Sequence, residues 1–119
     1  MGRLVQPLRS MGAEVWGRGG DNLPPLAIRG GNLHGMDYTL PVASAQVKSA
    51  LLLAGLFARG QTSLREPAPS RDHTERMLEG MGAKIIRDGL HLAISPLTSP
   101  LTALDLDIPG DMSSAAFWL

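Results

Sequence analysis

The stretch Ala43–Leu56, ASAQVKSALLLAGL, decides how this chain folds. From Val47 onward its apolar residues fall on nearly every side of a helix, and such a helix is buried among other elements. Its polar residues are confined to the start, where Ser44, Gln46 and Lys48 stand. The first amide groups of a helix have no partner within it and carry a partial positive charge. The pattern therefore predicts a buried helix with a polar, positively polarised start.

Spacing alone leaves two interpretations of this helix start open. In one, Ser44 only caps the helix and Gln46 is solvated, because serine is a common N-cap residue. In the other, Ser44 and Gln46 bind the hydroxyl or phosphate oxygens of an anion, and Lys48 adds a positive charge close by.

Composition indicates an ordinary globular protein. Of the 119 residues, 44% are hydrophobic and 18% are charged, and the formal charges cancel. A neutral chain with few aromatic residues lacks the basic surface that nucleic acids bind. With no cysteine and three scattered histidines, the chain offers no disulfide and no pattern of metal ligands. The longest apolar run, Ala50–Phe57, is too short to span a bilayer. We therefore expect a cytoplasmic protein with no nucleic acid, membrane or metal partner.

Helical and strand patterns follow one another along the chain. We expect helices over 3–11, 44–58 and from 73 onward, strands over 13–16, 26–28, 36–40 and 62–66, a loop over 17–25, and a hairpin over 85–92. Asp72 and Glu75 have the spacing of a capping box, and Asp88-Gly89 indicates a type I′ turn. The expected fold class is α/β, in the broad sense that includes α+β.

An internal repeat with an offset close to 70 residues organises the chain. LRSMGAEV, Leu8–Val15, returns as LEGMGAKI, Leu78–Ile85. The alternating apolar residues of 36–40 return at 104–108, which predicts a second half-buried strand with its two aspartates facing outward. A period this long suits a supersecondary unit of about two helices and four strands.

The repeat predicts two units, approximately 1–66 and 67–119. Each is cut at one end, because the pattern is already helical at Arg3 and stops within a helix start at Phe117–Leu119. We therefore expect a fragment of a larger protein.

A second candidate anion site lies in PSRDHTERML, Pro69–Leu78. It follows a predicted strand and precedes a helix, and loops at such turns often carry ligand groups. Arg71 presents a planar fork of donors that matches phosphate or carboxylate. The alternative is that Arg71 pairs with Asp72 or Glu75 on a solvated face.

In a third helix start, GDMSS, Gly110–Ser114, Asp111 is positioned to cap the helix.

Three stretches, SAQVKSALLLAGL, PSRDHTERMLEGMGA and DIPGDMSSAAF, together resemble the 5-enolpyruvylshikimate-3-phosphate synthases, also called 3-phosphoshikimate 1-carboxyvinyltransferases. The resemblance runs from Gly2 to Leu119 and implies two domains, each of three βαβαββ units. About two of these six units would be present, so that 1–119 would form part of the N-terminal domain.

The resemblance also implies a function. The enzymes of this family transfer the enolpyruvyl group of phosphoenolpyruvate to the 5-hydroxyl of shikimate 3-phosphate and release phosphate. They need no metal or organic cofactor, and we expect a cytoplasmic monomer of the shikimate pathway, which leads through chorismate to the aromatic amino acids.

Carried over by position, the resemblance implies that Ser44, Ala45 through its backbone amide, Gln46 and Arg71 bind shikimate 3-phosphate. Lys48 is a further candidate without an assigned ligand. The catalytic acid and base groups would lie outside these 119 residues, so we expect the chain alone to be inactive. Two alternatives remain, a UDP-N-acetylglucosamine enolpyruvyl transferase and a non-catalytic anion-binding α/β module.

Overall fold

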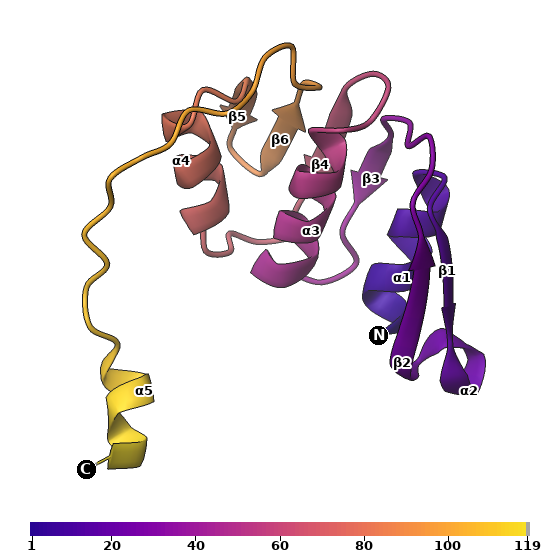
Figure 1. The fold of residues 1–119 in the computed structure, drawn as a ribbon, viewed down its shortest axis with the longest axis horizontal. Coiled ribbons are helices and arrows are strands. Elements are labelled where there is room, and N and C mark those ends of the chain that lie inside the picture. The colour runs from indigo at the N-terminus through magenta and orange to yellow at the C-terminus, as the bar shows by residue number, and fades with distance from the viewer. Residues whose placement is uncertain (119) are drawn as a thin grey trace.

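The computed structural model describes residues 1–118 and contains both helices and strands, as the predicted fold class requires (Figure 1). Its elements are α1 (Gly2–Ser10), β1 (Glu14–Gly17), α2 (Arg18–Asp21), β2 (Leu23–Arg29), β3 (Asp37–Thr39), α3 (Ala45–Gly55), β4 (Thr62–Arg65), α4 (His73–Gly80), β5 (Ile85–Asp88), β6 (His91–Ile94), α5 (Met112–Ala115) and the 3-10 helix η1 (Ala116–Trp118). Leu119, which ends the predicted C-terminal helix start, lies outside the described residues.

The strands form two sheets. β1 and β2 make an antiparallel hairpin, and the other four strands form one sheet in the order β3-β4-β6-β5. β3 and β4 are parallel, with Tyr38 opposite Leu64, whereas the remaining pairs of this sheet are antiparallel. Parallel strands end at the same edge of a sheet. The helices that follow them, α3 and α4, therefore both begin at that edge, the lower one in Figure 1.

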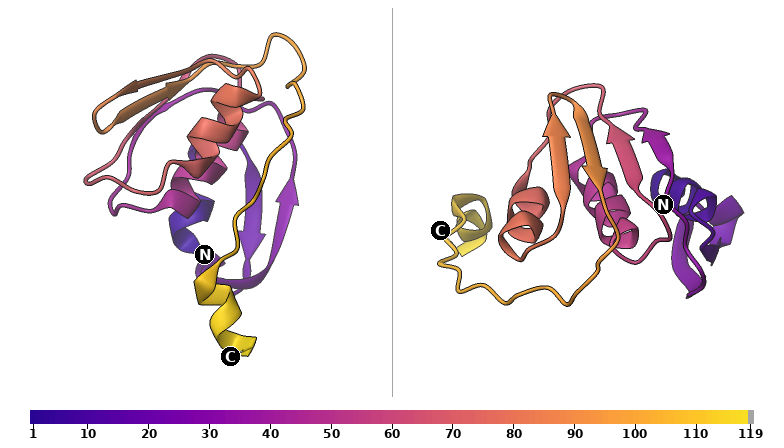
Figure 2. Two further views of the ribbon diagram at one scale, coloured as in Figure 1. Left: turned by 90° about the vertical axis from the view of Figure 1, so that its left-hand side faces the viewer. Right: turned by 90° about the horizontal axis from the view of Figure 1, so that it is seen from above.

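The core lies between α3 and the four-stranded sheet, with α4 beside α3 on the same face of that sheet (Figure 2). Leu51 and Leu52 of α3 are fully buried against a set that includes Leu64 of β4, Leu78 of α4 and Ile94 of β6. Because α3 is apolar on nearly every side, it also packs against α1. The predicted buried helix is confirmed, although it ends three residues earlier than expected.

Part of the predicted loop 17–25 is regular structure. The chain turns through α2 and then enters β2 at Leu23, passing through Pro24 and Pro25. Proline in a strand is tolerated here because β2 pairs with β1 alone, so a missing amide donor interrupts no second ladder.

The hairpin of β5 and β6 was predicted in the right place but with the wrong turn. Asp88 pairs with His91, so Gly89 and Leu90 form the loop. Among the described residues, Gly89 has a positive φ of 58° and Leu90 does not. A positive φ at the first loop residue only is the pattern of a type II′ turn, whereas type I′ needs it at both.

The second strand predicted over 104–108 is absent from the described part of the chain. This segment leaves the sheet and runs toward α5 without a strand beside it (Figure 1). The side chain of Ile108 is 87% exposed and that of Leu106 is 59% exposed. A strand needs a hydrogen-bonded neighbour, so alternation alone does not produce one, and Asp105 and Asp107 do not lie on the outer face of a sheet.

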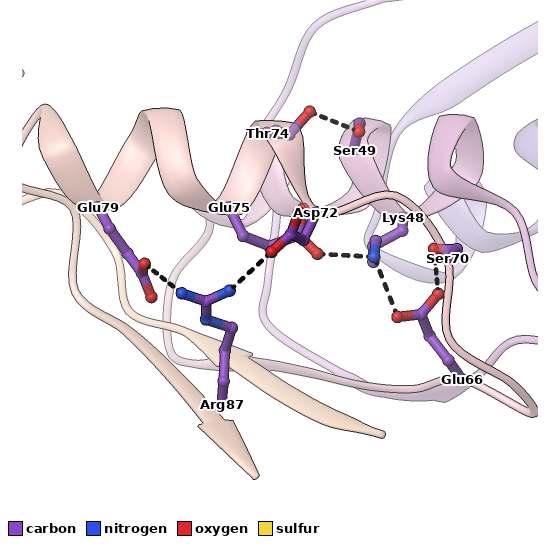
Figure 3. A network of polar contacts seen from close by, with 9 residues as sticks. All are labelled: Lys48, Ser49, Glu66, Ser70, Asp72, Thr74, Glu75, Glu79 and Arg87. Atoms are coloured by element: carbon purple, nitrogen blue, oxygen red, sulfur yellow. Dashed lines mark hydrogen bonds and ion pairs between the residues drawn. The ribbon is translucent and has the colours of Figure 1, made fainter. Parts of the chain in front are cut away.

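A buried ion cluster of Lys48, Glu66 and Glu75 fastens α3 to β4 and α4 (Figure 3). The Lys48 side chain is 1% exposed, and its Nζ lies 3.0 Å from Glu66 Oε2 and 2.6 Å from Glu75 Oε1. The predicted capping box is therefore wrong, because Asp72 makes no capping hydrogen bond and Glu75 turns inward to the ammonium. A buried ammonium is very costly without such partners, which explains the inward turn.

Two opposing effects act on the pKa of Lys48. Burial alone lowers the pKa of this ammonium because it disfavours the charged form. The hydrogen bonds with Glu75 and Glu66, together with the attraction of their charges, outweigh burial and raise the pKa above its ordinary value. Lys48 is therefore charged at neutral pH.

We expect Gly55→Ala to destabilise the fold. A Cβ at this position would lie 2.7 Å from Ile94 Cγ2 and 3.1 Å from Thr62 Cβ, which forces α3 away from the sheet. Helix propensity alone favours alanine by about 1 kcal/mol. Overpacking outweighs it, so the free energy of unfolding should fall by about 1–3 kcal/mol in urea denaturation followed by circular dichroism. Leu53→Ala, at an exposed position of the same helix, is the control. A gain in stability for Gly55→Ala would contradict the packing.

The raised pKa of Lys48 predicts a loss of stability on the alkaline side. Folding favours the protonated ammonium, so its contribution is complete below the unfolded-state pKa of about 10.4 and disappears as the pH rises through the higher folded-state value. Urea denaturation between about pH 8 and pH 11.5 should show this decline. In the neutral-cluster variant, Lys48→Met/Glu66→Gln/Glu75→Gln, the decline should be smaller. If stability declined with rising pH to the same extent in both proteins, the raised pKa of Lys48 would be refuted.

Candidate anion-binding site

The start of α3 is capped and still has a free donor. Ser44 is the N-cap residue, and its Oγ accepts a long hydrogen bond of 3.4 Å from the amide of Val47. This confirms the capping role that the sequence predicts. A serine hydroxyl also has one donor of its own, which the cap does not use. Capping and ligand binding by Ser44 are therefore compatible.

A cavity of about 150 Å³ lies at the start of α3. It is lined by Ser44, Gln46 and Val47 of this segment and by Met1, Arg3 and Leu4 at the start of the chain. None of these lining residues is acidic, and the cavity combines a hydroxyl, a carboxamide and a guanidinium near the positive end of a helix dipole. Such a group of donors suits an anion.

Arg3 is the cavity residue that the sequence alone does not single out. It belongs to α1, which packs against α3 in the structure. Nothing in the spacing of residues shows that two helices so distant in the chain begin side by side, because that contact depends on how the hairpin of β1 and β2 returns the chain. Ala45, by contrast, occupies the first position of α3 as expected, and its side chain is half-buried.

Arg71 is exposed in the loop between β4 and α4. The alternative pairing with Asp72 or Glu75 is not what the structure shows. Asp72 Oδ2 lies 3.3 Å from Arg87 Nη1, and Glu75 pairs with Lys48. Within residues 1–118, the Arg71 guanidinium has no hydrogen bond or ion pair, so it is available to a ligand.

A second cavity, of about 380 Å³, lies around the ion cluster. It is lined by three acidic and two basic side chains, Glu66, Asp72, Glu75, Lys48 and Arg87, together with Pro69, Ser70, Gly89 and Leu90. The surplus of carboxylates makes this space unsuitable for an anion, and the ammonium of Lys48 is already paired with Glu66 and Glu75 (Figure 3). The first cavity and Arg71 are therefore the better candidates.

The third polar helix start lies apart from the other two. Asp111 Oδ1 accepts from the amide of Ser113 at 2.9 Å, and Oδ2 accepts from Ser114 Oγ at 2.6 Å, which confirms the predicted cap. The hydrogen bond from Ser114, followed by that from the Ser113 amide, lowers the pKa of Asp111. α5 is exposed and lies away from the starts of α3 and α4, so it does not contribute to their site (Figure 1).

Metal-binding clusters and membrane-spanning helices are both missing from residues 1–118. These residues contain no group of three histidine, cysteine, aspartate or glutamate side chains that could hold a metal ion. No helix among them is both long enough and apolar enough to cross a membrane.

Known proteins resemble the whole chain. Residues 1–119 match the family described as EPSP synthase (3-phosphoshikimate 1-carboxyvinyltransferase). The chain is 58% identical to the 3-phosphoshikimate 1-carboxyvinyltransferase of Synechococcus sp. (strain JA-3-3Ab), with all of this chain and 27% of that protein covered. It is 56% identical to the enzyme of that name from Thermus thermophilus, again with the whole chain and 28% of the relative covered.

Solved structures agree with these matches. EPSP synthase from Acinetobacter baumannii superposes with a TM-score of 0.88 at 47% identity over 99% of this chain and 26% of its own. The enolpyruvyl transferase NikO from Streptomyces tendae, with a TM-score of 0.61 and 23% identity over 77% of this chain and 21% of its own, shares the fold. The UDP-N-acetylglucosamine alternative is not favoured. The chain spans little more than a quarter of its curated relatives and belongs to the EPSP synthase (3-phosphoshikimate 1-carboxyvinyltransferase) family.

Proposed function

We propose that this chain is the substrate-binding part of an enzyme that transfers the enolpyruvyl group of phosphoenolpyruvate to the 5-hydroxyl of shikimate 3-phosphate and releases phosphate. One observation supports the proposal most strongly. Two helices with anion-binding groups at their starts follow parallel strands and so begin at one sheet edge, in a chain of this family. Ligands of open α/β sheets commonly bind beyond the carboxyl ends of the strands.

Each proposed ligand contributes a different kind of donor. Arg71 contacts the phosphate of shikimate 3-phosphate, because its guanidinium can donate two parallel hydrogen bonds and is not neutralised by a described carboxylate. Ser44 donates its hydroxyl, Ala45 its backbone amide and Gln46 its carboxamide. The dipole of α3 favours the negative charge that these groups surround.

The side chains present in this chain indicate that it binds substrate and that proton transfer takes place elsewhere in the enzyme. Addition and elimination require an acid and a base within hydrogen-bond reach of the reacting atoms. None of the residues lining the cavity at the start of α3 is acidic, and Glu66 and Glu75 are bound to Lys48. We infer that the proton-transfer groups belong to the rest of a cytoplasmic, monomeric enzyme of aromatic amino acid biosynthesis.

The same proposal covers the domain organisation. The chain would form part of the N-terminal domain, with repeat units of approximately 1–66 and 67–119. In support, each unit contains a helix followed by an antiparallel hairpin, α1 with β1 and β2 in the first and α4 with β5 and β6 in the second.

We expect shikimate 3-phosphate to shift the amide signals of Ala45, Gln46 and Arg71 when it is titrated into the 15N-labelled chain. Arg71→Ala should weaken binding by about tenfold or more, as loss of a charge-assisted hydrogen bond does. Arg76→Ala, which removes an exposed arginine of α4, is the matched control. Sulfate is the comparison anion. Equal responses to sulfate and shikimate 3-phosphate, or shifts confined to other residues, would favour a non-catalytic anion-binding module.

We expect the isolated chain to release no phosphate from phosphoenolpyruvate and shikimate 3-phosphate, because the cavity at the start of α3 has no acidic residue in its lining. A chimera in which these residues replace the matching quarter of the Acinetobacter baumannii EPSP synthase should be active, since the two folds superpose closely. In this chimera, Arg71→Ala should lower kcat/KM more than Arg76→Ala does. Turnover by the isolated chain would contradict the inference that the proton-transfer groups lie outside it. A folded but inactive chimera would contradict the proposed function.

A further inference from the structure

We propose that Lys48 is a positioning residue, whose buried ammonium holds the loop bearing Arg71 in place against the start of α3. This inference rests on the proposed function of Ser44, Gln46 and Arg71. Lys48 itself is 1% exposed and is held by two carboxylates, an arrangement that favours a role inside the protein over contact with a substrate.

The contacts of Lys48 lead from one half of the site to the other. Lys48 stands one turn after Ser44, and its amide donates to the Ser44 carbonyl at 3.0 Å. Its Nζ lies 3.0 Å from Glu66 Oε2, at the point where β4 gives way to the loop. The other oxygen of Glu66, Oε1, accepts a hydrogen bond from Ser70 Oγ, and Arg71 is the next residue (Figure 3).

The same ammonium also fixes the far end of the loop. Glu75 lies in the first turn of α4, and its Oε1 is 2.6 Å from Lys48 Nζ. Both ends of the segment that carries Arg71 are therefore tied to a single atom of α3. A shift of α3 changes the position of Ser44 and of the loop together, which preserves the spacing between the two groups of ligands.

The loop has little else to hold it. Between Pro67 and Arg71, no backbone group forms a hydrogen bond with another backbone group in the described chain. Pro67, Ala68, Pro69 and Arg71 are exposed, whereas Ser70 is half-buried and bonded to Glu66. Few backbone hydrogen bonds and little burial are the features of a segment that opens easily. The contact with Glu66 is thus what restrains Ser70 and its neighbour.

Stability alone does not account for a lysine at this position. Apolar residues of similar volume often replace a buried ion cluster with no loss of stability. Two carboxylates share one ammonium here, and Glu75 Oε2 is buried without a hydrogen-bond partner among the described residues. An unsatisfied buried oxygen is a cost that a purely structural arrangement would avoid. The contacts of the cluster position the loop that carries Arg71, and this role explains why a lysine stands here despite the cost in stability.

The first test needs no ligand. In the neutral-cluster variant, we expect the backbone order parameters of Ser70 and Arg71 to fall, because these residues lose the contact that restrains them. The amides of the core residues Leu51 and Leu64 should keep their protection from hydrogen exchange, which shows that the fold is intact. Ser49→Ala is the matched control, because Ser49 Oγ contacts Thr74 Oγ1 at 2.7 Å and so joins α3 to α4 without touching the loop. Unchanged order at Ser70 and Arg71 in the neutral-cluster variant would overturn the proposal.

The second test is a double-mutant cycle on the affinity for shikimate 3-phosphate. The neutral-cluster variant should bind about tenfold more weakly than the unmodified chain, but should lose little further affinity in the Arg71→Ala background, because its effect passes through Arg71. An equal loss in both backgrounds would indicate a general structural effect and overturn the proposal. If the unmodified chain binds no shikimate 3-phosphate, the proposed function fails for this chain, and order at Ser70 and Arg71 still decides whether Lys48 positions the loop.

Discussion

The ammonium of Lys48 cannot be buried without carboxylates, and this requirement fixes three segments of the chain relative to one another. Glu66 reaches it from the end of β4 and Glu75 from the first turn of α4. Ion pairs between exposed side chains are screened and weakly directional, whereas a buried pair leaves little freedom in where its partners lie. The starts of α3 and α4 are therefore tied together by a contact that solvent does not weaken.

The topology of the sheet also determines where α3 and α4 begin. Because β3 and β4 are parallel and adjacent, the helix starts that follow them lie at one edge, with no need for a special loop conformation. The sheet brings the two starts to the same edge, and the ion cluster sets their relative position more closely. Ser44 and Arg71 therefore lie at the same edge of the sheet, although they belong to different helix starts and are separated by a complete crossover connection.

The sequence predicts elements whose stability is local and misses those that depend on distant partners. The all-round apolar pattern of α3 and the cap at Ser44 are local signals, and both are confirmed. Glu75 has the spacing of a capping residue, but it pairs with the buried Lys48 of α3 instead. Leaving this ammonium buried and unpaired would destabilise the fold more than losing the cap of α4 does. The alternation over 104–108 likewise yields no strand without a neighbour to pair with. Arg3 joins the cavity only through the packing of α1 on α3.

The distribution of charge separates binding from chemistry within the proposed site. The residues that line the cavity at the start of α3 include no carboxylate, and two carboxylates of the neighbouring segments, Glu66 and Glu75, already neutralise Lys48. Both carboxylates are held by the ammonium of Lys48 and are therefore already engaged within the protein. The cavity at the start of α3 is therefore better suited to hold an anion than to transfer a proton.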